Sequence, residues 1–125
     1  MARQLGRGPG RVLVGLYILF AVAAGARSAV QIATKFDEAP VAYLLSAAAA
    51  VVYLVAAIAF LRSWRTAAIA CCTVELAGVL TVGTVSLLVP SAFPDQTVWS
   101  VYGEGYGFVP LVLPVLGLWW LLRRN

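Results

Sequence analysis

The chain has 125 residues, of which 62% are hydrophobic and only 11% are charged, and its formal net charge is +4. Soluble domains carry about 25% charged residues, and disordered chains combine low hydrophobicity with high net charge, so both classes are excluded. The sequence contains no histidine and two cysteines, which excludes histidine-based metal sites, Ser-His triads and a disulfide scaffold. The composition therefore indicates a small polytopic membrane protein.

Four apolar segments predict four membrane-spanning helices in a single domain over residues 1–125. A helix needs about 20 apolar residues to cross the hydrocarbon core. Because every backbone group must be hydrogen-bonded internally in lipid, we expect an all-α fold. The predicted spans cover residues 12–33, 40–61, 66–89 and 104–122. The last apolar run, residues 108–122, is only about 22 Å long as a helix, so this span is extended back to about residue 104.

Prolines agree with these limits. Pro40 begins the second span, where a missing N–H leaves no hydrogen bond unmade. Pro90 and Pro94 follow the third span and end it. Pro110 and Pro114 lie inside the fourth span, where we expect a kink or a loosened first turn.

Basic residues gather on one side of this topology. With the N-terminus in the cytoplasm, the N-terminal tail, the connection between spans two and three, and the C-terminal tail hold seven arginines and no acid. This asymmetry predicts a plasma (inner) membrane protein with both termini cytoplasmic. Aromatic residues support it: the inner interface carries Trp64, Trp119 and Trp120, and the outer one carries Tyr43, Trp99, Tyr102 and Tyr106.

The N-terminal segment also fits a second interpretation. Its arginine-rich flank, its apolar run and the small-residue stretch AAGARSA resemble a secretory signal peptide. Cleavage near Ala26 or Ala29 would leave three spans. Four spans explain the charge distribution equally well without processing, so we adopt the four-span topology.

Glu75 is the most informative polar residue, because it lies near the middle of the third predicted span. Carboxylates at this depth are costly and are functional candidates by default. Glu75 either binds a proton or a cationic substrate, or it fixes helix packing by pairing with another polar residue. Cys71 and Gly78 share its helical face, which predicts a narrow groove with one acid in it. The candidate pairing partners are Arg27, Gln31, Ser46, Tyr53 and Thr81.

Arg27 and Gln31 are the other candidates for this intramembrane polar site. Arg27, Gln31 and Thr34 share one helical face, which we expect to look into the bundle. Arg27 either reaches Glu75 across an axial offset of about 9 Å or extends outward to an acid of the outer connections. Both interpretations of Arg27 stay open.

The connection at residues 90–107 is unusually long and aromatic for a loop in a compact domain. Three interpretations stay open: an anchor in the outer interface or a segment folded back over the bundle, a lid or ligand mouth, and a partner-docking surface. Gly103, Gly105 and Gly107 allow an unusual backbone there. The candidate outer-face residues are Asp95, Trp99, Tyr102, Glu104 and Tyr106.

Three strings, ARSAVQIATKFDEAPVAYLLSA, TVELAGVLTVGT and FPDQTVWSVYGEGYGFVPLVLPVLGLWW, resemble small integral membrane proteins of high-GC actinobacteria, over about residues 11–122. The resemblance implies a plasma-membrane location and a four-helix architecture. It implies neither an activity nor a catalytic residue.

The sequence favours a structural, accessory or partner-binding role over catalysis. We expect no enzyme activity, metal or cofactor, because nucleophile and phosphate-loop motifs are missing. The expected partners are the lipid bilayer and a homo-oligomer or larger membrane complex, and not nucleic acid, since no basic helix face is present. The alternative function is a small proton- or cation-coupled transporter that uses Glu75.

Overall fold

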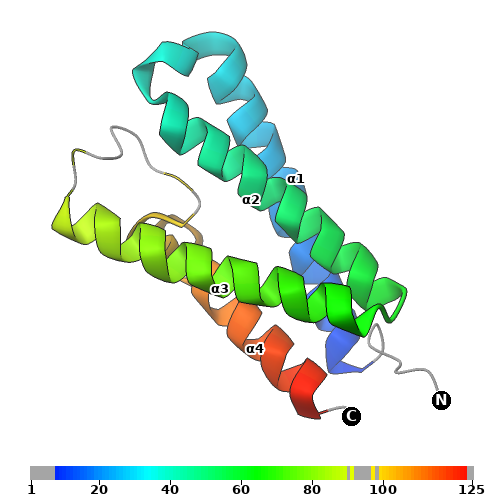
Figure 1. Ribbon diagram of the computed structural model, residues 1–125. Coiled ribbons are helices and arrows are strands. Elements are labelled where there is room, and N and C mark those ends of the chain that lie inside the picture. Colours follow the sequence, from blue (N-terminus) through cyan, green and yellow to red (C-terminus); the bar gives the residue numbers. More distant parts are fainter. Residues whose placement is uncertain (1–7, 90, 92–96, 98, 124–125) are drawn as a thin grey trace.

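The computed structural model describes residues 8–89, 91, 97 and 99–123, and this part of the chain is helical, without β-strands (Figure 1). The predicted all-α fold with four helices is confirmed. The elements, in chain order, are α1 (Pro9–Lys35), the 3₁₀ turn η1 (Phe36–Glu38), α2 (Pro40–Leu61), α3 (Arg65–Leu88), the 3₁₀ segment η3 (Ser100–Tyr106) and α4 (Val109–Arg123).

Three of these helices are long and apolar enough to cross a membrane, namely those of residues 10–38, 40–61 and 65–88. They indicate a membrane protein. The predicted helix over residues 104–122 is wrong at its start, because α4 has 15 residues and begins only at Val109. Gly107 and Phe108 have φ angles of 65° and 61°, and this left-handed backbone interrupts any continuous helix.

The helices pair as two hairpins, α1 with α2 and α3 with α4 (Figure 1). The hairpins meet where α2 leads into α3, and they diverge toward the α1–α2 turn. At the end where they meet, the Arg65 guanidinium donates two hydrogen bonds, of 2.9 and 3.3 Å, to the Leu121 carbonyl near the end of α4. The beginning of α1 lies there too, since a Cβ at Gly8 would contact Trp120.

Both ends of the described chain therefore lie at the same end of the bundle. Guanidinium groups lie over indole rings at this end, 5.9 Å from the Trp64 ring for Arg62 and 5.2 Å from the Trp119 ring for Arg123. Cation–aromatic pairs of this kind suit a membrane interface. The two chain ends thus lie on the same side of the bundle, as the predicted topology requires. The assignment of that side to the cytoplasm stays a prediction.

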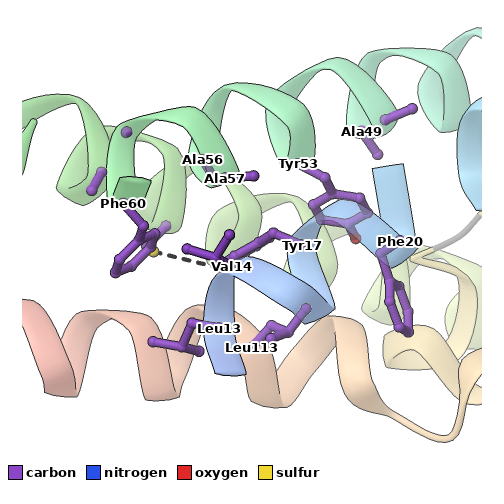
Figure 2. Packing of buried hydrophobic residues seen from close by; sticks show 14 of the residues in the cluster. Leu13, Val14, Tyr17, Phe20, Ala49, Tyr53, Ala56, Ala57, Phe60 and Leu113 are labelled. Carbon is purple, nitrogen blue, oxygen red and sulfur yellow. Dashed lines mark hydrogen bonds between the residues drawn. The ribbon is translucent and has the colours of Figure 1, made fainter. Parts of the chain in front are cut away.

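Alanines and aromatic rings hold α1 against α2. Buried alanines alternate along α2 at helical spacing and let α1 approach closely, as small residues do in membrane helix pairs. Four rings fill the remaining space (Figure 2). The Tyr17 ring stacks on the Phe60 ring at a centroid distance of 5.9 Å, and the Phe20 ring meets Tyr53 edge-on at 6.2 Å. This aromatic layer places Tyr17 at the level of α3 where Glu75 lies.

Candidate functional site

Glu75 lies on the one face of α3 that is buried throughout. It comes ten residues after Arg65, which is about 15 Å along the helix axis. Its side chain has no exposed surface. Its neighbours on this face, at spacings of three and four residues, are Ala68, Cys72, Val79 and Val82. The carboxyl group is therefore enclosed within the bundle, close to the middle of a helix long enough to span a membrane.

Neither carboxyl oxygen of Glu75 has a hydrogen-bond partner among the described residues. Buried polar groups are nearly always hydrogen-bonded, and an unpartnered one needs a specific explanation. Leaving a charge buried and unpaired costs several kcal/mol in general. Among the described residues, Glu75 and Gln31 are the two buried side chains that depart from this rule, and Glu75 is the charged one.

Tyr17 of α1 and Cys72 of α3 lie next to this carboxyl group. The Tyr17 hydroxyl and the Cys72 thiol are 3.5 Å apart and share a hydrogen bond in which either atom can donate. The Tyr17 hydroxyl also interacts electrostatically with Glu75, although outside hydrogen-bonding geometry. The long Tyr17 side chain thereby connects α1 to α3, whose backbones do not approach closely.

Gly117 closes the site from α4. A Cβ at this position would lie 2.7 Å from the Cys72 sulfur and 3.5 Å from the Tyr17 hydroxyl, both at or inside ordinary contact distance. Only a residue without a side chain lets α4 pack so close to this cluster. All four helices contribute, since Phe60 of α2 would also contact such a Cβ at 3.5 Å.

Trp99 covers the site from the segment before α4. Its ring lies on Gly78, one turn from Glu75, where a Cβ would be 2.6 Å from the nearest ring atom. Its indole N–H donates a 2.8 Å hydrogen bond to the Tyr53 hydroxyl of α2. Only 5% of the Trp99 surface is exposed, so this part of the outer segment folds back into the bundle.

The structure does not bring the three residues of the predicted polar site together. Arg27 and Thr34 are exposed on α1, so the expectation that their face looks into the bundle is wrong for both. Arg27 also lies away from Glu75 along the bundle, because α1 starts at Pro9 and Arg27 is therefore about 27 Å along this helix, about 12 Å beyond the level of Glu75. Arg27 is not a hydrogen-bond partner of Glu75.

Gln31 is buried, as expected, with 5% of its surface exposed. It lies close to the α1–α2 turn, where the hairpins diverge (Figure 1). Its Oε1 has no hydrogen-bond partner in the part of the chain that the structure describes. Gln31 therefore forms a separate polar position rather than a part of the Glu75 site.

The candidates of the outer segment are described unequally. Trp99 and Tyr102 pack against α3, on Gly78 and Gly83 respectively. Asp95 lies outside the described residues, and so do the side chains of Glu104 and Tyr106, whose backbone belongs to η3. The sequence also offered Tyr53, Thr81 and Ser46 as pairing partners of Glu75. Tyr53 accepts a hydrogen bond from Trp99, Thr81 is exposed, and Ser46 is buried on α2.

Sequence reasoning missed Tyr17 and chose the wrong cysteine. Cys71 is half-buried and Cys72 is the buried one beside Glu75. Both spacings to Glu75, three and four residues, are compatible with one helical face, so spacing alone could not separate them. Tyr17 carried no signal beyond being the one aromatic hydroxyl of the first span.

Comparisons with models of protein families, with curated proteins and with solved structures gave no match.

Proposed function

We propose that this protein is a multi-pass protein of the plasma (inner) membrane, with both termini in the cytoplasm, in which Glu75 binds and releases a proton as part of proton-coupled transport. One observation carries the proposal: a fully enclosed carboxyl group at mid-helix with no hydrogen-bond partner among the described residues. Such a group destabilises the fold, and a function is the default explanation for its presence.

The surroundings of Glu75 favour a proton over a metal cation. Metal cations such as Ca²⁺ require six to eight oxygen ligands and Mg²⁺ requires six. The titratable neighbours are Tyr17, Cys71 and Cys72, none of which is a carboxylate. The described residues contain no cluster of metal-binding side chains. A proton needs neither a cavity nor a ligand cage, and the tight contact at Gly117 leaves little room for one.

The proposed topology makes α4 a short fourth span. Its 15 residues extend about 22 Å, and the bilayer can thin or flanking side chains can extend toward water to match it. Arginines lie at the end where the chain termini meet, and the acids Asp37 and Glu38 lie at the α1–α2 turn. The positive-inside rule then places the arginine end in the cytoplasm. A reporter fused after Asn125 is expected to be active in the cytoplasm, and a periplasmic or external signal would refute this orientation.

The proton-binding role is tested in reconstituted vesicles. An imposed pH gradient is expected to drive proton uptake by the native chain and not by Glu75→Gln, whose amide cannot ionise. Glu38→Gln, which changes an exposed carboxyl group at the α1–α2 turn, serves as the matched control and is expected to retain uptake. In parallel, infrared difference spectra recorded across pH are expected to show a carboxyl C=O band that Glu75→Gln lacks.

The accessory or partner-binding role, which the sequence favoured, stays the alternative. The same variant distinguishes the two functions. If Glu75→Gln keeps its yield and oligomeric state but loses uptake, the carboxyl group acts in transport. If the variant folds and takes up protons as the native chain does, Glu75 is not needed for uptake. If the variant fails to accumulate, Glu75 serves helix packing. Either result refutes transport through Glu75.

A further inference from the structure

We infer that residues Trp99–Gly103, called the strap below, close the access to Glu75 from the end of the bundle opposite the chain termini. This inference rests on Glu75 being the proton-binding site and assigns the regulation of that site. The closure is made by side chains and backbone of the described residues alone.

The strap lies directly in the outward direction from Glu75. Gly78, which receives the Trp99 ring, is about 4.5 Å beyond Glu75 along α3. Gly83, which receives the Tyr102 ring, is about 12 Å beyond it. Two aromatic rings therefore pack on α3 between Glu75 and the end of that helix, one on half-buried Gly78 and one on buried Gly83.

The Trp99 ring also bridges two helices. It lies on α3, and its N–H bonds to the Tyr53 hydroxyl of α2 over 2.8 Å. The Tyr53 ring in turn lies 6.1 Å from the Tyr17 ring, centroid to centroid. Trp99 thus contacts both hairpins, α3 through its ring at Gly78 and α2 through its indole N–H at Tyr53.

Side-chain hydrogen bonds fasten the rest of the strap to α3. The Val101 N–H donates to the Ser86 hydroxyl over 2.8 Å, and that hydroxyl donates to the Gly83 carbonyl. The Tyr102 hydroxyl and the Thr84 hydroxyl are 2.9 Å apart. These bonds depend on side chains and not on a regular backbone ladder, so the strap can separate from α3 without unfolding a helix.

The closed strap holds a strained backbone. Val101 and Tyr102 have φ angles of 50° and 59°, in the left-handed region that β-branched and bulky residues avoid. Such strain persists only where surrounding contacts impose it. Once the contacts of Trp99 and Tyr102 are lost, relaxation of this strain favours the open form. A segment held by a few contacts against its own strain has the properties of a gate.

The test measures the access of a reagent to Glu75 rather than transport. The full chain in lipid vesicles is treated from outside with a water-soluble carbodiimide, and modification of Glu75 is followed by peptide mass spectrometry. Trp99→Ala is expected to raise the labelling rate about tenfold or more, because the rate follows the population of open molecules. Trp119→Ala, which removes an exposed tryptophan at the other end of the bundle, is expected to leave the rate unchanged.

A milder variant guards against loss of folding. Tyr53→Phe keeps the ring and removes the hydroxyl that accepts the Trp99 hydrogen bond, and a smaller rise in labelling is expected. The inference is overturned if folded Trp99→Ala or, where that variant does not fold, Tyr53→Phe labels at the native rate. It is equally overturned if Trp119→Ala raises the rate as much. Because labelling does not require uptake, a protein that shows gated labelling without proton uptake would refute the proposed function and leave the strap standing.

Discussion

Gly78→Ala tests the packing of Trp99 on α3. In an isolated helix the substitution is favourable, since alanine exceeds glycine in helix propensity by about 1 kcal/mol. Here the new Cβ would lie 2.6, 2.7 and 3.0 Å from three atoms of the Trp99 ring. Carbon atoms in contact are about 3.5–4.0 Å apart, so the ring must move by about 1 Å.

The ring cannot make this move without cost, because its N–H bonds to Tyr53 over 2.8 Å. Overpacking of a tight core costs about 1–3 kcal/mol, and loss of one hydrogen bond costs about 1 kcal/mol more. Subtracting the gain in helix propensity leaves a net destabilisation of about 1–3 kcal/mol for Gly78→Ala. The matched control is Gly15→Ala on α1, where a Cβ has nothing within 4 Å. The control is expected to be neutral or stabilised by up to about 1 kcal/mol.

The assay is reversible unfolding in mixed micelles with increasing sodium dodecyl sulfate, followed by circular dichroism at 222 nm. Both variants replace glycine by alanine inside a helix, so their difference isolates the contact with Trp99. We expect the native chain and Gly15→Ala to unfold at higher detergent fractions than Gly78→Ala. Equal midpoints for the two variants would show that Trp99 does not lie on Gly78, and they would remove the basis of the strap.

Two further predictions concern α4. Gly117→Ala is expected to destabilise the fold by about 1–2 kcal/mol, because its Cβ would lie 2.7 Å from the Cys72 sulfur. Adding Cys72→Ala should restore most of this loss in a double-mutant cycle in the same unfolding assay, and additive effects would contradict the contact. Arg65→Ala removes two hydrogen bonds to the Leu121 carbonyl, which should cost about 1–2 kcal/mol. Faster amide exchange confined to the last turn of α4 would report this loss. Unchanged exchange would show that the Arg65 hydrogen bonds to the Leu121 carbonyl do not stabilise the end of α4.

The positions of the long helices could be predicted from the sequence because lipid imposes a length on them. The predicted span 40–61 agrees to the residue with α2, since proline at a helix start has a strong positional meaning. The prediction for α4 failed at its start for the converse reason. No rule of composition indicates that Phe108 takes a left-handed φ angle, and its N–H donates a 3.0 Å hydrogen bond to the Gly103 carbonyl in a turn before α4.

The faces of the helices could not be predicted, because lipid is as apolar as the protein interior. In a soluble helix the polar side identifies the surface, and that contrast is missing here. Arg27 illustrates the failure: its charge suggested a place inside the bundle, whereas an arginine near the end of a helix can extend to water along the surface. Glu75 could be recognised as unusual from the sequence, because an acidic residue inside an apolar span is uncommon whichever side of the helix it faces.

The same contrast explains why the sequence left open whether the outer segment lies in the interface or folds back over the bundle. Aromatic residues in an outer loop fit an interfacial anchor as well as an insertion into the bundle. The distinguishing signal lies on α3 and not in the loop. Gly78 and Gly83 leave two hollows on the surface of α3, and the Trp99 and Tyr102 rings fill them. The two glycines of α3 therefore predict this packing only when they are considered together with the two aromatic residues that lie on them.

The three glycine contacts bear on the meaning of Glu75. At Gly78, Gly83 and Gly117 a bulky group of another element comes closer than any side chain would permit, so the bundle is closely fitted around the carboxyl group. In such a core an apolar residue of similar size would give greater stability than an unpartnered acid. A residue that does not suit an otherwise well-packed core is usually kept because it serves a function, although it lowers stability. In the part of the chain that the structure describes, the other buried side-chain oxygen without a partner belongs to Gln31 near the α1–α2 turn. The close packing around Glu75 therefore supports the proposal that its carboxyl group is a site and not a defect of packing.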